Sequence, residues 1–240
     1  MAKHKKLKKP DTAQATQSNQ LIEASYKMSV PAKRVMLMLL SQIHPHQNNI
    51  TDKIRIEAAD YGERTGTDIG NSYREIKKGC RELMKTIVIT KNISAKTTSE
   101  CVVVSWMEYH DNQGWLDARF TEWIKPYIQH LNRIGYTTIA VDEALKFRRF
   151  YTIRLYELMM QFRKSGERYI TLDDLRRTFQ IEKGKYTRFI DLKRRVIEPS
   201  IKEIQLKADW IIDWDPIKTR RTVTSLSFIF EKQKQRDLFR

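Results

Sequence analysis

The stretch YTRFIDLKRRVIEPSIKEI, residues 186–204, decides the fold because it places three consecutive positive charges inside an amphipathic helix. At about 100° per residue, charged side chains share one face, and aliphatic and aromatic side chains share the other. Lys193 falls toward the apolar side, where its charge must reach out along its methylene stem. Pro199 removes one backbone hydrogen bond, so the helix is expected to kink or end near Val196.

The residues alone leave two interpretations of this helix open. On a solvated face, Asp191 with Arg195 and Glu198 with Lys202 are favourable i, i+4 pairs. If the stretch is instead the second helix of a helix-turn-helix, its N-terminal part enters the DNA major groove. There arginine can bond guanine O6 and N7, and aspartate can accept from cytosine N4. The candidate DNA-binding side chains in that part are Arg188, Asp191, Lys193, Arg194 and Arg195.

The composition of the chain says more about its binding partner than about its fold. The 240 residues include 45 Lys and Arg against 29 Asp and Glu, a net charge of +16 with a pI near 9.8, which favours nucleic acid over other partners. The longest aliphatic run, residues 35–40, is too short to cross a bilayer, and no secretory signal begins the chain. Two cysteines, Cys80 and Cys101, make neither a disulfide framework nor a metal set. We therefore expect a cytoplasmic protein without cofactor or metal.

The order helix, short strand, helix, turn, helix and hairpin occurs twice, at a spacing of roughly 115–119 residues. This order is that of a winged helix, a helix-turn-helix followed by a β-hairpin wing. We predict an α+β fold with two tandem winged-helix domains related by a pseudo-repeat. In the first half, the short strand is residues 53–57, the helices begin at 58 and 71, and the hairpin joins residues 86–93 to 100–109. In the second half, the short strand is residues 168–170, the helices begin at 171 and 186, and the hairpin joins WIIDW to TVTSLSFIF.

The predicted domains are a flexible basic arm over residues 1–18, an N-terminal winged helix over 19–135 and a C-terminal winged helix over 136–240. The last of these holds 24 basic and 15 acidic residues, whereas the first 135 residues owe five of their positive charges to the arm. We therefore expect the second domain to supply the main base-specific recognition, and the first to supply phosphate contacts and dimerisation.

Two further groups of basic residues are candidate DNA contacts. The loop PIKTRR would put its cations at the tip of the second wing, suited to phosphate or the minor groove. The helix from residue 71 is richer in lysine, which suits phosphate better than bidentate base reading. The residues are Lys218, Arg220 and Arg221 at the wing tip, and Arg74, Lys77, Lys78 and Arg81 on the first-domain helix.

Three stretches, TQSNQLIEASYKMSVPAKRVMLMLLSQI, RLYELMMQF and residues 186–204, resemble the iteron-binding plasmid replication initiators of the RepE, RepA and π type, over roughly residues 17–232. The resemblance implies a bacterial, plasmid-associated protein whose monomers bind direct repeats of double-stranded DNA at an origin and help to open the duplex. It also implies homodimers that bind an inverted repeat and repress their own gene, chaperones that shift dimer to monomer, and recruitment of host initiator and helicase. The family's base-reading Arg and basic triplet correspond to Arg188 and to Lys193, Arg194 and Arg195, with Lys193 standing where the family often has Arg.

Other function classes fit the sequence less well. A rolling-circle nickase needs a His-hydrophobic-His motif, and the only candidate, His44–His46, has a proline between its histidines and reads as a turn. Gly184-Lys185 lacks the partner glycine of a P-loop. The helices have core faces rather than the exposed apolar face of a membrane-surface helix. A dimeric transcriptional repressor without initiator activity shares the fold and the arginines, and remains the closest alternative to a non-enzymatic initiator.

Overall fold

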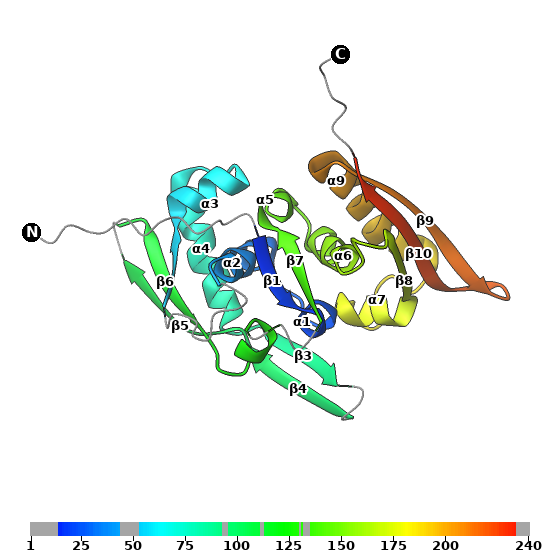
Figure 1. The fold of residues 1–240 in the computed structure, drawn as a ribbon, viewed down its shortest axis with the longest axis horizontal. Helices are drawn as coiled ribbons and strands as arrows, with labels where there is room; N and C mark the ends of the chain where they lie inside the picture. Colours follow the sequence, from blue (N-terminus) through cyan, green and yellow to red (C-terminus); the bar gives the residue numbers. More distant parts are fainter. Residues whose placement is uncertain are drawn as a thin grey trace, which may run out of the picture.

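The computed structural model describes residues 14–43, 53–92, 96–110, 113–129, 131 and 135–233. Two groups of helices and strands lie side by side, with helices α2 and α6 and strands β1 and β7 between them (Figure 1). The helices are α1 (Asn19–Glu23), α2 (Val30–Ser41), α3 (Ala58–Thr65), α4 (Ile69–Leu83), α5 (Val141–Ala144), α6 (Phe150–Met160), α7 (Leu172–Thr178), α8 (Phe189–Leu192) and α9 (Glu198–Ala208). The strands are β1 (Gln14–Ser18), β2 (Ile54–Glu57), β3 (Ile87–Asn92), β4 (Thr97–Val102), β5 (Val104–His110), β6 (Trp115–Phe120), β7 (Tyr136–Ala140), β8 (Glu167–Thr171), β9 (Trp210–Thr219) and β10 (Thr222–Lys232).

The first winged helix consists of α2, β2, α3 and α4 with the three-stranded sheet β2-β6-β5. Between α3 and α4 the chain turns at Gly66, whose φ of 71° lies in the left-handed region that glycine adopts without strain. The Asp68 side chain then caps α4 by accepting a hydrogen bond of 3.0 Å from the Asn71 N–H. Gly79 lets α4 approach α2 closely, because a Cβ there would lie 2.9 Å from Val35 Cγ2.

The hairpin of the first unit differs from the one predicted from the sequence. Residues 86–93 and 100–109 do not form a single two-stranded hairpin, because the second stretch bends at Val103. β4 pairs with β3, whereas β5 pairs with β6, a strand that was not predicted from the sequence. Thr121 fixes the bend, since its N–H donates to Val103 O at 3.1 Å and its hydroxyl to Val102 O at 2.7 Å. The wing is therefore β5–β6, and β3–β4 is an additional hairpin that extends from the body of the molecule (Figure 1).

Residues 14–18 also differ from the expected flexible arm. They form β1, which pairs antiparallel with β7 in a register that sets Gln14 opposite Ala140 and Ser18 opposite Tyr136. The polar composition of this stretch suggested disorder, but a polar side chain in it is hydrogen-bonded inside the fold. Gln17 is buried, and its Nε2 donates to Glu157 Oε1 at 2.9 Å. The rest of the predicted arm, residues 1–13, lies outside the described residues.

The second winged helix follows the predicted order closely. α6, β8, α7 and the helical segment from α8 to α9 precede the hairpin β9–β10, and the sheet order is β8-β10-β9. The hairpin buries Trp210, Ile212, Phe228 and Phe230 against the helices. Its long strands extend at the far end of the molecule from the first wing (Figure 1).

The irregularity expected near Pro199 is present as a π-helical turn over Lys193–Ile197, between α8 and α9. Here the Glu198 N–H donates to Lys193 O, five residues back, and the nitrogen of Pro199 has no hydrogen to donate. The Ser200 hydroxyl bonds Val196 O at 2.6 Å, which satisfies a carbonyl of this turn. The three basic residues therefore begin the widened part of the helix and do not continue an even 100° spacing.

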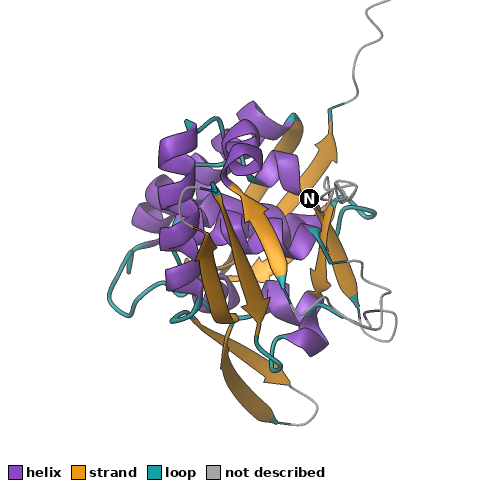
Figure 2. Ribbon diagram, turned by 90° about the vertical axis from the view of Figure 1, so that its left-hand side faces the viewer, coloured by secondary structure: helices purple, strands orange, loops and turns teal. Residues whose placement is uncertain are grey.

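The joint between the two units is buried along most of its two central helices. Residues 32–40 of α2 and 152–160 of α6 are buried on every side, so these helices belong to one core shared by both units. Helices gather in the middle of the molecule and strands extend from it (Figure 2). Within the described ranges, no helix combines the length and apolarity that crossing a bilayer requires.

Candidate nucleic-acid interface

Arg188 and Asp191 stand at the start of the second helix of the C-terminal helix-turn-helix and bind each other. Arg188 Nε donates to Asp191 Oδ2 at 2.8 Å and Nη2 donates to Oδ1 at 3.1 Å, a bidentate contact. This hydrogen-bonded guanidinium lowers the pKa of Asp191, and the charges of Arg195 and Arg194 act in the same direction. The expected i, i+4 pair of Asp191 with Arg195 is replaced by an i, i+3 pair, because Arg188 sits at the helix N-cap in an extended conformation.

Lys193 is half-buried and connects this helix to the wing. Its Nζ lies 5.4 Å from the centroid of the Trp214 ring on β9 and 3.5 Å from Glu198 Oε1. The sequence placed Lys193 toward the apolar side, and in the structure its charge rests on an aromatic face at that side. The Glu198 carboxylate, expected to pair with Lys202, faces Lys193 instead.

Arg194 and Arg195 are exposed, and neither makes an ion pair or a side-chain hydrogen bond with any part of the chain that the structure describes. They are thus two guanidinium groups with all donors available to an external acceptor. A guanidinium offers its donors as a rigid fork that matches phosphate or the Hoogsteen edge of guanine.

The tip of the second wing carries three exposed cations. Lys218 is the next-to-last residue of β9, and Arg220 and Arg221 form the turn to β10, where Thr219 pairs with Thr222. Arg220 has a φ of 58°, an unusual value for a residue other than glycine, asparagine or aspartate. Across the described residues, the three side chains have no ion pair or side-chain hydrogen bond, so the wing ends in free positive charge.

On α4 of the first unit, the candidate cations are partly occupied within the protein. Lys77 Nζ lies 4.2 Å above the ring of Tyr109 on β5, and Arg81 Nε donates to the Tyr109 hydroxyl at 3.0 Å. Arg74 donates to the Asn71 side chain. Lys78 is exposed and makes no side-chain contact of these kinds within the described ranges.

Sequence reasoning missed two aromatic residues that position these cations, Tyr109 and Trp214. Each lies on the wing strand that packs beside the second helix of its own helix-turn-helix. The signal was present, since each aromatic sits in the β-rich segment after a basic helix, but the side toward which its ring points depends on strand register. In both units, therefore, an aromatic ring of the wing holds a lysine of the helix.

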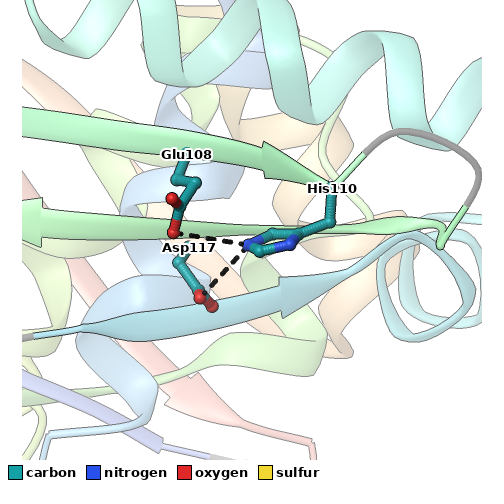
Figure 3. Close-up of side chains that lie close together, drawn as sticks. All are labelled: Glu108, His110 and Asp117. Atoms are coloured by element: carbon teal, nitrogen blue, oxygen red, sulfur yellow. Dashed lines mark ion pairs between the residues drawn. The ribbon is translucent and has the colours of Figure 1, made fainter.

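One group of side chains among the described residues has the composition of a metal site, although the sequence led us to expect none. Ligand atoms of Glu108, His110 and Asp117, on the wing sheet of the first unit, all lie within 4.8 Å of one another (Figure 3). The nickase candidate motif His44–His46 lies outside the described residues.

Two winged helices in tandem, each with basic side chains on its second helix and one with a basic wing tip, define the class of helix-turn-helix proteins that bind DNA. Comparison with known families makes the class specific. Residues 14–160 match the family described as "Initiator Replication protein, WH1", and residues 171–230 match "Initiator Rep protein, WH2". The chain belongs to this family of replication initiator proteins.

Two proteins and one solved structure are similar to this chain over most of its length. An uncharacterized 27.6 kDa protein of Escherichia coli is 27% identical over 204 residues, which cover 80% of this chain and 84% of that protein. The PI protein of Escherichia coli is 28% identical over 224 residues, covering 80% of this chain and 73% of that protein. The crystal structure of the Pi initiator protein in complex with iteron DNA shares the fold with a TM-score of 0.80 at 22% identity, covering 93% of this chain and 99% of that one.

Proposed function

We propose that the chain is a plasmid replication initiator that binds directly repeated iterons at the origin as a monomer, promotes duplex opening and recruits host replication proteins. The observation that carries this proposal is the pair Arg194 and Arg195, exposed and unpaired at the N-terminal part of the second helix, beside the free cations of the wing tip. Membership of the initiator family supports it, and so does the solved complex of the similar Pi protein with iteron DNA. The chain acts in this proposal by binding and not by catalysis.

The two units divide the work in this proposal. The C-terminal unit reads bases, because its candidate contacts are mostly arginines. Four of these have no ion pair or side-chain hydrogen bond with the described residues: Arg194, Arg195, Arg220 and Arg221. The N-terminal unit positions the protein on phosphates. On α4, the Lys78 side chain is exposed, whereas Lys77 and Arg81 contact Tyr109. The domain limits at 19–135 and 136–240 remain part of this proposal.

Dimerisation through the first unit, repression of the initiator's own gene, and contacts with host initiator, helicase and chaperones are proposed on the family resemblance. A bacterial cytoplasmic location is proposed with them. A dimeric repressor without initiator activity is the second candidate, because the same helix and wing would serve it equally well.

One experiment separates the two candidates. The purified chain would be footprinted on its own plasmid origin and on its upstream promoter, and the size of each complex would be measured. Protection of several direct repeats by one monomer each, with distorted DNA beside them, is expected of an initiator. Protection of an inverted repeat alone, by a dimer, would overturn the initiator proposal in favour of the repressor.

A further inference from the structure

The outer face of the first wing sheet brings a histidine and two carboxylates together. β5 and β6 pair so that Glu108 lies directly opposite Asp117, and His110 lies two residues further along β5 on the same face. Two like charges opposite each other in an antiparallel pair destabilise the sheet unless a cation lies between them. Asp117 is only 6% exposed, so water solvates its carboxylate poorly.

The histidine has a nitrogen without a hydrogen bond that is aimed at both carboxylates (Figure 3). His110 Nε2 is buried and lies 3.5 Å from Asp117 Oδ2 and 3.6 Å from Glu108 Oε2. These distances are too long for good hydrogen bonds. They agree with the separation of about 3.4 Å that a tetrahedral zinc ion imposes on ligand atoms about 2.1 Å from it.

The ring of His110 is held in place by the sheet. It stacks on Trp115 at a centroid distance of 3.4 Å and an interplanar angle of 25°. The Arg55 guanidinium also lies against Trp115, 3.2 Å from the ring centroid. A ligand fixed on a strand by packing is the arrangement that a preformed metal site needs.

We propose that Glu108, His110 and Asp117 bind one first-row divalent cation, preferentially zinc, near the turn end of the β5–β6 hairpin of the first wing. One imidazole nitrogen and two carboxylate oxygens are ligands that such ions accept, and three protein ligands leave further positions for water. The ion would lie between the two opposed carboxylates and fasten β5 to β6. It forms no part of the DNA-binding proposal, so either can fail without the other.

Two cationic side chains of the protein, Arg55 and Lys53, already contact the carboxylates of the site. Arg55 Nε donates to Asp117 Oδ1 at 3.1 Å and Nη2 reaches Oδ2 at 3.4 Å, so Arg55 engages chiefly the oxygen that faces away from His110. Lys53 Nζ lies 3.2 Å from Glu108 Oε2, the same oxygen that faces His110. Lys53 is therefore the direct competitor of the ion, and removing its charge should tighten metal binding.

The test is a titration of the metal-stripped full chain with Co²⁺, followed by visible absorption, and with Zn²⁺ in competition by calorimetry. We expect one ion per chain, and His110→Asn should weaken binding by about 10-fold or more. Glu108→Gln, at an exposed position, should weaken it as well, which guards against misfolding of the histidine variant. Lys53→Met should strengthen it. The matched control is the double variant His44→Asn with His46→Asn, which should bind as the wild type does.

Either of two results would overturn the proposal. One is the absence of stoichiometric binding, which would make the cluster a set of ion pairs only. The other is binding that survives His110→Asn and disappears in the His44 and His46 control. Circular dichroism of each variant would establish that it is folded before its affinity is compared.

Discussion

Lys33 Nζ lies 2.7 Å from Glu157 Oε1, and both side chains are fully buried. Lys33 belongs to α2 and Glu157 to α6, so this ion pair joins the two winged helices at their shared core. Arg154 adds a second buried cation, with Nη1 2.6 Å from Glu157 Oε2 and Nη2 bonded to the carbonyls of Ile22 and Ala24. One carboxylate thus contacts two cations, and all three side chains are fully buried.

Glu157→Gln should therefore destabilise the whole molecule. It leaves two buried cations without a counter-charge, and breaking a buried pair in this way typically costs about 3–5 kcal/mol. Denaturant unfolding followed by circular dichroism would measure the loss. Glu182→Gln is the matched control, because Glu182 pairs with Lys27 at an exposed site, where the loss of an ion pair has little effect on the free energy of unfolding. Equal effects of the two substitutions would contradict the role assigned to Glu157.

The stability of the joint should depend on pH through Lys33. Burial, with Arg154 nearby, lowers the pKa of Lys33 to about 8 in spite of Glu157. The unfolded lysine titrates near 10.4, so between these values the unfolded state holds more protons, and the free energy of unfolding rises with pH. The unfavourable contribution is fully present below about pH 8 and is relieved above it.

Comparison with Lys33→Met isolates this effect. The unfolding free energy of the wild type relative to the variant should increase between about pH 7.5 and about pH 9.5. Burial also raises the pKa of Tyr26, which lowers stability as the unfolded tyrosine ionises, but that effect begins only near its unfolded pKa of about 10. A difference between the proteins that stays constant with pH would show that Lys33 does not titrate in this window.

Arg194→Ala and Arg195→Ala should each weaken binding to the cognate repeat by about 1–3 kcal/mol and relax the base preference locally. The reason is that both guanidinium groups are free to contact base edges. Arg163→Ala removes an exposed arginine in the turn after α6, and serves as the control with little expected effect. Fluorescence anisotropy on cognate and unrelated duplexes would measure both. Equal losses on the two duplexes would mean that the arginines touch only phosphate.

Asp191→Asn should raise affinity for all DNA while reducing discrimination. The substitution removes a negative charge near the phosphates and releases Arg188 from its bidentate partner. It also replaces the charged acceptor for cytosine N4 with a neutral amide that offers one acceptor oxygen beside a donor NH2, so the ratio of cognate to unrelated affinity should fall by about 10-fold. The same anisotropy titrations give both numbers. A ratio that stays unchanged would place Asp191 outside base recognition.

Combined Lys77→Ala and Lys78→Ala should weaken cognate and unrelated DNA alike and reduce the salt slope of binding by about 1–2. Each lysine that neutralises a phosphate contributes close to one unit of that slope. Affinity measured across a series of salt concentrations provides the check. Tyr109→Phe is an informative companion, because it keeps the ring under Lys77 and removes only the hydroxyl that Arg81 uses. An unchanged slope in the double variant would remove α4 from the interface.

The sequence predicted the features that depend on local pattern. The second wing follows from strand patterning, and the interruption near Pro199 follows from one missing N–H. The features it missed depend on contacts between distant segments. The bend at Val103 is held by Thr121, and the strand at residues 14–18 exists only because β7 pairs with it.

The candidate site shows the same division at the level of single side chains. Helical spacing allowed Asp191 two partners, and the extended backbone of Arg188 selected one of them. Strand register, which the sequence left open, turned Tyr109 and Trp214 toward the lysines that they hold.

The pairing of β1 with β7 has a consequence for the order in which the protein folds during synthesis. Gln17, near the start of the chain, donates to Glu157, 140 residues later. The first described strand, β1, therefore has no strand to pair with until β7 emerges, and the Gln17 side chain has no Glu157 until α6 emerges. At about 5–20 residues per second that wait lasts on the order of 10 seconds. All elements of the first winged helix therefore leave the ribosome before β1 can pair with β7.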